Sequence, residues 1–191
     1  TTEEYSTLRT VLQNQKTCRF YRLSVVDDMD GRNHLGISMR PISPADAADF
    51  VADPKHGAAD MFIGTVRNHN LGKSVNGVSY DVFEELTLQT FRELCEKSRE
   101  RWGESLNIFI EHFKGRLDIG GISILIAVSS PHRDESFKAC RFIIEEIKHR
   151  APIWKQEHYT DGDSEWVQGH ALCSHGPVSY DDESSHGHCS H

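Results

Sequence analysis

A proline interrupts a helical pattern near residue 150, and this break constrains the fold more than any other feature of the sequence. Pro152 has no amide proton, clashes with a preceding helical turn and keeps the residue before it out of the α region. The helix upstream should therefore end near Arg150. Lys148 precedes the break and Lys155 follows it. The sequence thus predicts two amines carried by different backbone segments at one bend.

The residues around the break favour partial burial of both lysines. One apolar stripe at helical spacing ends beside Lys148; it consists of Phe137, Cys140, Ile144 and Ile147. Beyond the proline, Ile153 and Trp154 should pack inward and fix the backbone that carries Lys155. A lysine withdrawn from water beside other cations has a lowered pKa, so its amine can act as an acid, base or nucleophile. The alternative is that Lys148 is an ordinary helix-end charge and Lys155 a solvated loop residue.

The chain is long enough for one domain with tails. Its 191 residues include only 37% hydrophobic residues, which indicates that part of the length buries nothing. We expect a partly ordered N-terminal extension over residues 1–36, a folded domain over 37–175 and a disordered, His-rich tail over 176–191.

Charge and cysteine usage exclude several classes of protein. The formal net charge of −8 argues against a general nucleic-acid binder but permits a local basic pocket. No apolar run approaches the roughly 18 residues that a membrane span needs, so we expect no membrane association. Cys95 and Cys140 fall on apolar helix faces. Buried free thiols favour a reducing, cytoplasmic location.

The hydrophobic pattern predicts an α+β fold. There is no G-x-G-x-x-G turn or Walker loop, and the elements do not alternate as in doubly wound proteins, so we expect a mixed or antiparallel sheet packed with helices. Strands are predicted over 20–26, from 37, and over 61–67, 75–83, 106–112 and 122–128. Helices are predicted over 3–15, 44–51, 84–102 and 131–148, two of them opened by the Ser-Pro pairs at 43–44 and 130–131.

Further cations lie at the ends of predicted elements. Arg67 ends a strand, and His132 with Arg133 lies at a helix start, where free N–H groups favour a phosphate or carboxylate. An unbroken helix would place His132 and Lys148 on the order of 24 Å apart. Either these groups serve separate sites, or a symmetric dimer brings His132 and Arg133 of one copy to the lysines of the other. We favour the dimer; the alternative for the helix start is two solvated side chains.

The C-terminal tail contains soft metal ligands at short range, namely His170, Cys173, His175, His186, His188, Cys189 and His191. Their spacing matches no standard zinc finger, and such tracts are only compositional. We predict no metal site and no cofactor. A metal-binding protein that works through this tail is kept as an alternative.

Several spaced motifs resemble the large, catalytic subunits of molybdopterin synthase. They are Phe62–Asn68, Val128–Arg133, and Lys148 with Pro152–Lys155, and the similarity spans about residues 37–170. The resemblance implies a dimeric, α/β-hammerhead-like α+β fold. It also implies a sulfurtransferase that converts cyclic pyranopterin monophosphate to molybdopterin. The implied sulfur donor is the thiocarboxylated C-terminal glycine of a ubiquitin-like small subunit, and two copies of each chain form a heterotetramer.

The resemblance also implies roles for individual residues. Arg67, His132 and Arg133 would hold the substrate phosphate and pterin. Lys148 would meet the thiocarboxylate, and Lys155 would be the acid/base group. The implied substrate contacts further include Thr65, Val66, Gln156 and Glu157.

Three positions depart from the family pattern. The family often has His-Arg at His112-Phe113, a second lysine at Gln156, and in some members an arginine at His170. Because the paired lysines remain, we expect an active enzyme. A catalytically idle relative that binds a ubiquitin-like partner is the other alternative.

Overall fold

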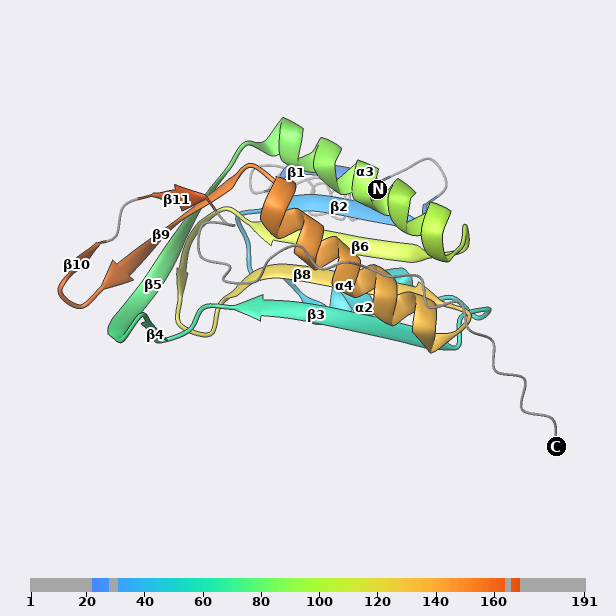
Figure 1. Ribbon diagram of the computed structural model, residues 1–191, viewed down its shortest axis with the longest axis horizontal. Helices are drawn as coiled ribbons and strands as arrows, with labels where there is room; N and C mark the ends of the chain where they lie inside the picture. Colours follow the sequence, from blue (N-terminus) through green and yellow to red (C-terminus); the bar gives the residue numbers. More distant parts are fainter. Residues whose placement is uncertain (1–21, 28–30, 164–165, 169–191) are drawn as a thin grey trace, which may run out of the picture.

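A mixed five-stranded sheet forms the centre of the molecule (Figure 1). The computed structural model describes residues 22–27, 31–163 and 166–168. In spatial order the strands are β1 (Arg22–Asp27), β2 (Asn33–Ser38), β6 (Asn107–Phe113), β8 (Ile122–Ser130) and β3 (Ala58–Thr65). β2 and β6 are parallel, and the other neighbours are antiparallel.

In the described part of the chain, three helices cover the two faces of this sheet. α3 (Glu84–Trp102) and α4 (Arg133–Arg150) lie side by side on one face, and α2 (Pro44–Val51) covers the other (Figure 1). The helices bury their apolar stripes against β6 and β8; residues of this core include Phe91, Leu94, Phe142, Ile143, Ile110 and Ile126. β8 is buried along almost its whole length, which suits its continuous run of apolar residues. The α+β prediction is confirmed.

A smaller antiparallel sheet lies at one end of the first (Figure 1). Its main path is β10 (Gly162–Asp163), β9 (Ile153–Tyr159), β5 (Lys73–Val82) and β4 (His69–Asn70), while β7 (Gly115–Asp118) pairs with β5 and β11 (Val167–Gln168) with β9. The turn between β4 and β5 places Leu71 at φ 48° and Gly72 at φ 76°, both in the left-handed region. The sequence patterns did not predict β7 or β9.

The proline break has the predicted effect on the chain. α4 ends at Arg150, and Ala151 is extended at φ −72° and ψ 132°. The carbonyl of Pro152 accepts a hydrogen bond from the Phe83 amide at 3.1 Å, which ties the bend to the start of α3. The chain then continues directly as β9, which pairs with β5. The bend therefore carries the chain from the helical layer into the second sheet.

Two local predictions at α4 are wrong. The Ser43 cap of α2 is confirmed, but α4 begins at Arg133 with His132 as its N-cap. Ser130 is the last residue of β8, and its hydroxyl donates to the carbonyl of His132 rather than capping the helix. Phe137 was expected in the buried stripe, yet it is 56% exposed, beside Met61 and Phe62 of the edge strand β3.

The sheet begins upstream of residue 37. The strand expected over 20–26 is present as β1, which pairs with β2, and β2 pairs with β6. The helix expected over 3–15 and the His-rich tail lie outside the described residues.

Cys95 and Cys140 are buried free thiols, as predicted. Within the described part of the chain, no helix is long and apolar enough to cross a membrane.

Candidate active site

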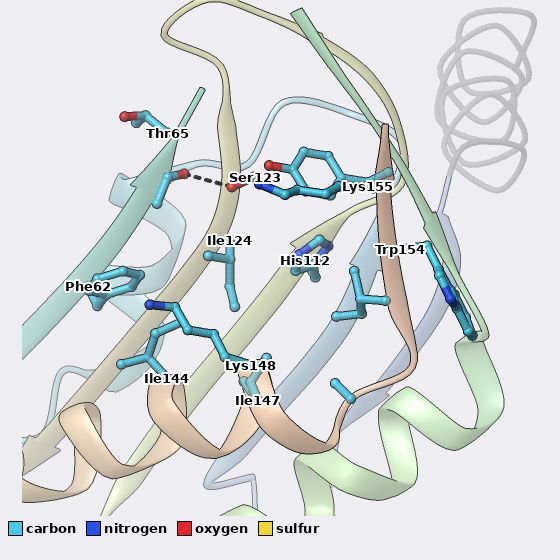
Figure 2. Close-up of a pocket in the computed structure, with 14 residues that line it drawn as sticks. Phe62, Thr65, His112, Ser123, Ile124, Ile144, Ile147, Lys148, Trp154 and Lys155 are labelled. Carbon is cyan, nitrogen blue, oxygen red and sulfur yellow. Dashed lines mark hydrogen bonds between the residues drawn. The ribbon is translucent and has the colours of Figure 1, made fainter. Parts of the chain in front are cut away.

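A cavity of about 200 Å³ lies where the end of α4 meets both sheets (Figure 2). Its wall is largely apolar, and a few polar groups converge on it, as in many small-molecule sites. The lining residues come from β3, β5, β6, β8, α4 and β9; those used below are Thr65, Tyr80, His112, Ser123, Lys148 and Lys155. We refer to this cavity as the lysine pocket.

The structure brings both predicted lysines into this pocket. Lys148 extends from the last turn of α4 beside Ile144 and Ile147, and Lys155 extends from β9 on the other side (Figure 2). Both are partly buried. Among the described residues Lys148 has no hydrogen-bond or ion-pair partner, so its amine is available to an anion. The predicted bend, with one lysine on either side of it, is present, and both lysines line the same cavity.

Lys155 has a carboxylate as its nearest charged partner, not the other cations that the sequence argument assumed. Its Nζ lies 3.0 Å from Oε1 of Glu157, two residues along the same face of β9. Glu157 is buried and also accepts hydrogen bonds from the Asn70 amide at 2.8 Å and from the Tyr159 hydroxyl. Burial alone would raise the pKa of Glu157, but the three donors outweigh it and hold the pKa below its ordinary value of 4.5. The charged carboxylate thereby fixes the position of the Lys155 amine.

We expect Glu157→Gln to destabilise the fold by about 1–2 kcal/mol at neutral pH, because a buried charged hydrogen-bond acceptor is lost. A carboxyl with a lowered folded pKa contributes stability that is complete above pH 4.5 and is lost as the pH falls through the folded pKa. Urea unfolding from pH 7 to pH 3 should therefore show a steeper loss for the wild type than for Glu157→Gln. Glu96→Gln, on the exposed face of α3, is the matched control. Equal pH dependence in wild type and Glu157→Gln would contradict this assignment.

A smaller hollow of about 70 Å³ adjoins the lysine pocket and contains most of the other expected contacts. Its wall includes Thr65, Val66, Arg67, Lys155 and Glu157. Thr65, Tyr80 and Lys155 line both spaces, so the two hollows are neighbours. The exposed Arg67 guanidinium lies 3.5 Å from the Asn70 side-chain oxygen at the mouth of this hollow. A cation at the rim beside two lysines suits an anionic ligand.

Three predicted residues do not join the pocket within one chain. His132 and Arg133 are exposed at the start of α4, a helix of 18 residues, whereas Lys148 is in its last turn (Figure 1). The helical rise separates the two ends by about 24 Å. Gln156 is on the face of β9 opposite Lys155 and lines neither space. One chain therefore holds both lysines and Arg67, but not His132 or Arg133.

Uncharged polar groups in the lysine pocket were not predicted as site residues. His112 on β6, Tyr80 on β5 and Ser123 on β8 all line it. Burial lowers the pKa of His112 to about 4, so the ring is neutral at physiological pH. Burial also raises the pKa of Tyr80, which keeps its phenol protonated. The family's frequent His-Arg pair at positions 112–113 was the one sequence signal that pointed to His112. Tyr80 and Ser123 carried none, because three separate strands bring these residues together.

The predicted absence of a metal site is neither supported nor contradicted for the tail, which lies outside the described residues. Within the part of the chain that the structure describes, no group of three or more His, Cys, Asp or Glu side chains could hold a metal ion.

Comparison with known proteins gives consistent matches over most of the chain. A family model described as MoaE protein matches residues 37–150. The chain is 44% identical over 142 residues to the molybdopterin synthase catalytic subunit of Synechococcus elongatus, covering 74% of this chain and 86% of that protein. It is 40% identical over 133 residues to the catalytic subunit of a Nostoc species, covering 70% and 81% of the two chains.

A solved structure agrees with the sequence matches. The crystal structure of molybdopterin synthase from Staphylococcus aureus superposes with a TM-score of 0.65 at 32% identity, over 69% of this chain and 94% of that one. The family model covers the helix that carries Lys148 and ends at residue 150, before Pro152 and Lys155.

Proposed function

The chain belongs to the MoaE family of molybdopterin synthase catalytic subunits, and from this membership we propose that its lysine pocket carries out the sulfur transfer of molybdenum cofactor biosynthesis. The substrate is cyclic pyranopterin monophosphate and the product is the dithiolene molybdopterin. The sulfur comes from the thiocarboxylated C-terminal glycine of a ubiquitin-like small subunit, which leaves as a carboxylate after each transfer. The partner and the chemistry of its tail follow from the resemblance of the motifs.

One observation supports this proposal most strongly: two lysines from different elements converge on one partly apolar pocket. A phosphorylated substrate and a thiocarboxylate are both anions, and a protein of net charge −8 must concentrate cations locally to bind them. Lys148, with no partner among the described residues, is placed to receive the thiocarboxylate. Lys155, held by Glu157, is placed to move protons as sulfur adds and oxygen leaves. Arg67 at the adjoining rim binds the phosphate.

Reconstitution tests the proposal directly. The full chain is incubated with the precursor and a thiocarboxylated small subunit, and the dithiolene product is followed as its oxidised fluorescent derivative. We expect product only when all three components are present. An idle relative would bind the small subunit without forming product, and a protein that works through its tail would lose its function when residues after Gly176 are deleted.

We propose that two copies pair so that His132 and Arg133 of one chain complete the pocket of the other. β3 is the last strand of its sheet among the described residues, and Ile63 on this strand is 41% exposed. Phe137, one turn after Arg133 on the neighbouring α4, is also exposed. An apolar surface beside an open strand edge is suited to association. A symmetric pair would repeat the contact in both directions.

Phe137→Asp should weaken this association, because the contact would then bury an unpaired charge. Sedimentation should show dimers for the wild type and mostly monomers for the variant at the same concentration. A monomeric wild type that is fully active at the assay concentration would reject the shared site.

We place the protein in the cytoplasm. The support is chemical, since the buried thiols of Cys95 and Cys140 are free and persist most readily in a reducing compartment.

A further inference from the structure

We propose that His112 is a substrate-positioning residue whose Nε2 accepts a hydrogen bond from an N–H or O–H group on the uncharged ring system of the substrate. The inference rests on the proposed function, because it assigns a role within the same pocket. It adds a neutral recognition element to a site in which Lys148 and Lys155 bind the anionic groups.

The backbone fixes which ring nitrogen faces the pocket. Nδ1 of His112 lies 2.8 Å from the carbonyl oxygen of Phe113, and a carbonyl can only accept, so Nδ1 carries the proton. In the neutral ring Nε2 is then an acceptor. Among the described residues Nε2 has no hydrogen-bond partner. The hydrogen bond from Nδ1 to Phe113 therefore makes Nε2 the acceptor of the ring.

The His112 ring is buried in the wall of the lysine pocket and held in one orientation. His112 is only 5% exposed, and Figure 2 shows its ring between the segment that carries Lys155 and the helix that carries Lys148. Tyr80 packs edge-on against it, with ring centroids 5.2 Å apart and planes at 77°. The ring is therefore held by packing and by the bond to Phe113. A buried acceptor held in one orientation discriminates strongly for a ligand that supplies a donor.

The chemistry of the surroundings indicates which part of the substrate meets His112. The phosphate is drawn to the cations, whereas a neutral acceptor offers nothing to an anion. Ile124, Ile147 and Ile153 line the same space, and an apolar wall suits a flat ring. A pterin ring carries N–H donors on its edge. The geometry therefore assigns the ring system to the His112 side of the pocket and the phosphate to the cationic rim.

Two substitutions separate this role from a structural one. In His112→Asn the amide nitrogen takes the place of Nδ1, which keeps the bond to Phe113 and removes the pocket acceptor. In His112→Gln the amide oxygen takes the place of Nε2, which keeps the acceptor. Both are assayed in the reconstituted system for KM of the precursor and for kcat, and their thermal midpoints are compared with the wild type.

We expect His112→Asn to raise KM about tenfold, the effect of one unmade hydrogen bond, with a wild-type thermal midpoint. His112→Gln should keep KM within about threefold of the wild type. A wild-type KM for His112→Asn would overturn the inference. So would equal losses in both variants with lowered thermal midpoints, since these indicate a structural role. A wild-type chain that makes no product contradicts the proposed function itself, which keeps the two failures distinct.

Discussion

Replacing Lys155 by alanine should lower the rate of molybdopterin formation by about a thousandfold, the middle of the range for a positioned general acid or base. The amine is held by Glu157 at 3.0 Å and faces the pocket from β9. Its loss removes both the proton donor and a charge beside the substrate. The backbone of β9 should remain, because its pairing with β5 does not depend on this side chain. The rate is measured in the reconstituted assay with saturating small subunit.

Two further variants show what kind of loss this is. Lys138→Ala is the control. Lys138 is an exposed lysine on α4 that pairs with Asp134 at 2.8 Å, and its removal should leave the rate unchanged. Lys155→Arg keeps the positive charge but replaces the amine by a guanidinium, which does not give up a proton in proteins. It should be nearly as slow as Lys155→Ala. Molybdopterin formation at the normal rate by Lys155→Ala would remove the proposed mechanism.

Arg133→Ala should lower the rate by about a hundredfold although the residue is far from the lysine pocket of its own chain. The reason is that its guanidinium, supplied across the dimer, would make two charge-assisted hydrogen bonds to the substrate, each of which contributes about 1.5–3 kcal/mol. Most of the loss should appear as a raised KM for the precursor. Steady-state kinetics with varied precursor measure this effect.

The control for Arg133 is an exposed arginine on another helix. Arg92 on α3 is exposed, and Arg92→Ala should have wild-type kinetics. Full activity of Arg133→Ala in a dimeric protein would show that the start of α4 serves no part of the site. The proposal that each chain completes the pocket of the other would then be rejected, even if the protein is a dimer.

The parts of the site that the sequence predicted are those fixed by local chemistry. Pro152 ends α4 because of its own covalent structure, so Lys148 could be placed in the last helical turn in advance. The apolar residues near the break then placed Lys155 on the other side of a buried corner. Ser43 and Pro44 likewise marked the start of α2. These local effects depend on only a few neighbouring residues, so the folded protein shows the structure that they predict.

The parts that the sequence did not predict depend on distant pairing. In β9, apolar and polar residues do not alternate, so neither face is apolar along the whole strand. β9 forms a strand because it pairs with β5. The counterion Glu157 could therefore not be placed against Lys155 in advance. His112 reads as the end of an ordinary strand, and its position in the pocket arises only when β5, β6 and β8 converge. Phe137 fitted the helical period but lies on the exposed side.

A mixing experiment tests the shared site most directly. Lys155→Ala and Arg133→Ala chains are each nearly inactive alone, and they are combined in equal amounts under conditions that allow the dimers to exchange. Half of the dimers should then be mixed, and each mixed dimer has one pocket with both an intact Lys155 and an intact Arg133 from the other chain. The account predicts recovery of about a quarter of the wild-type rate, as expected for a site shared across a twofold axis. A rate no higher than the average of the two separate variants would contradict it.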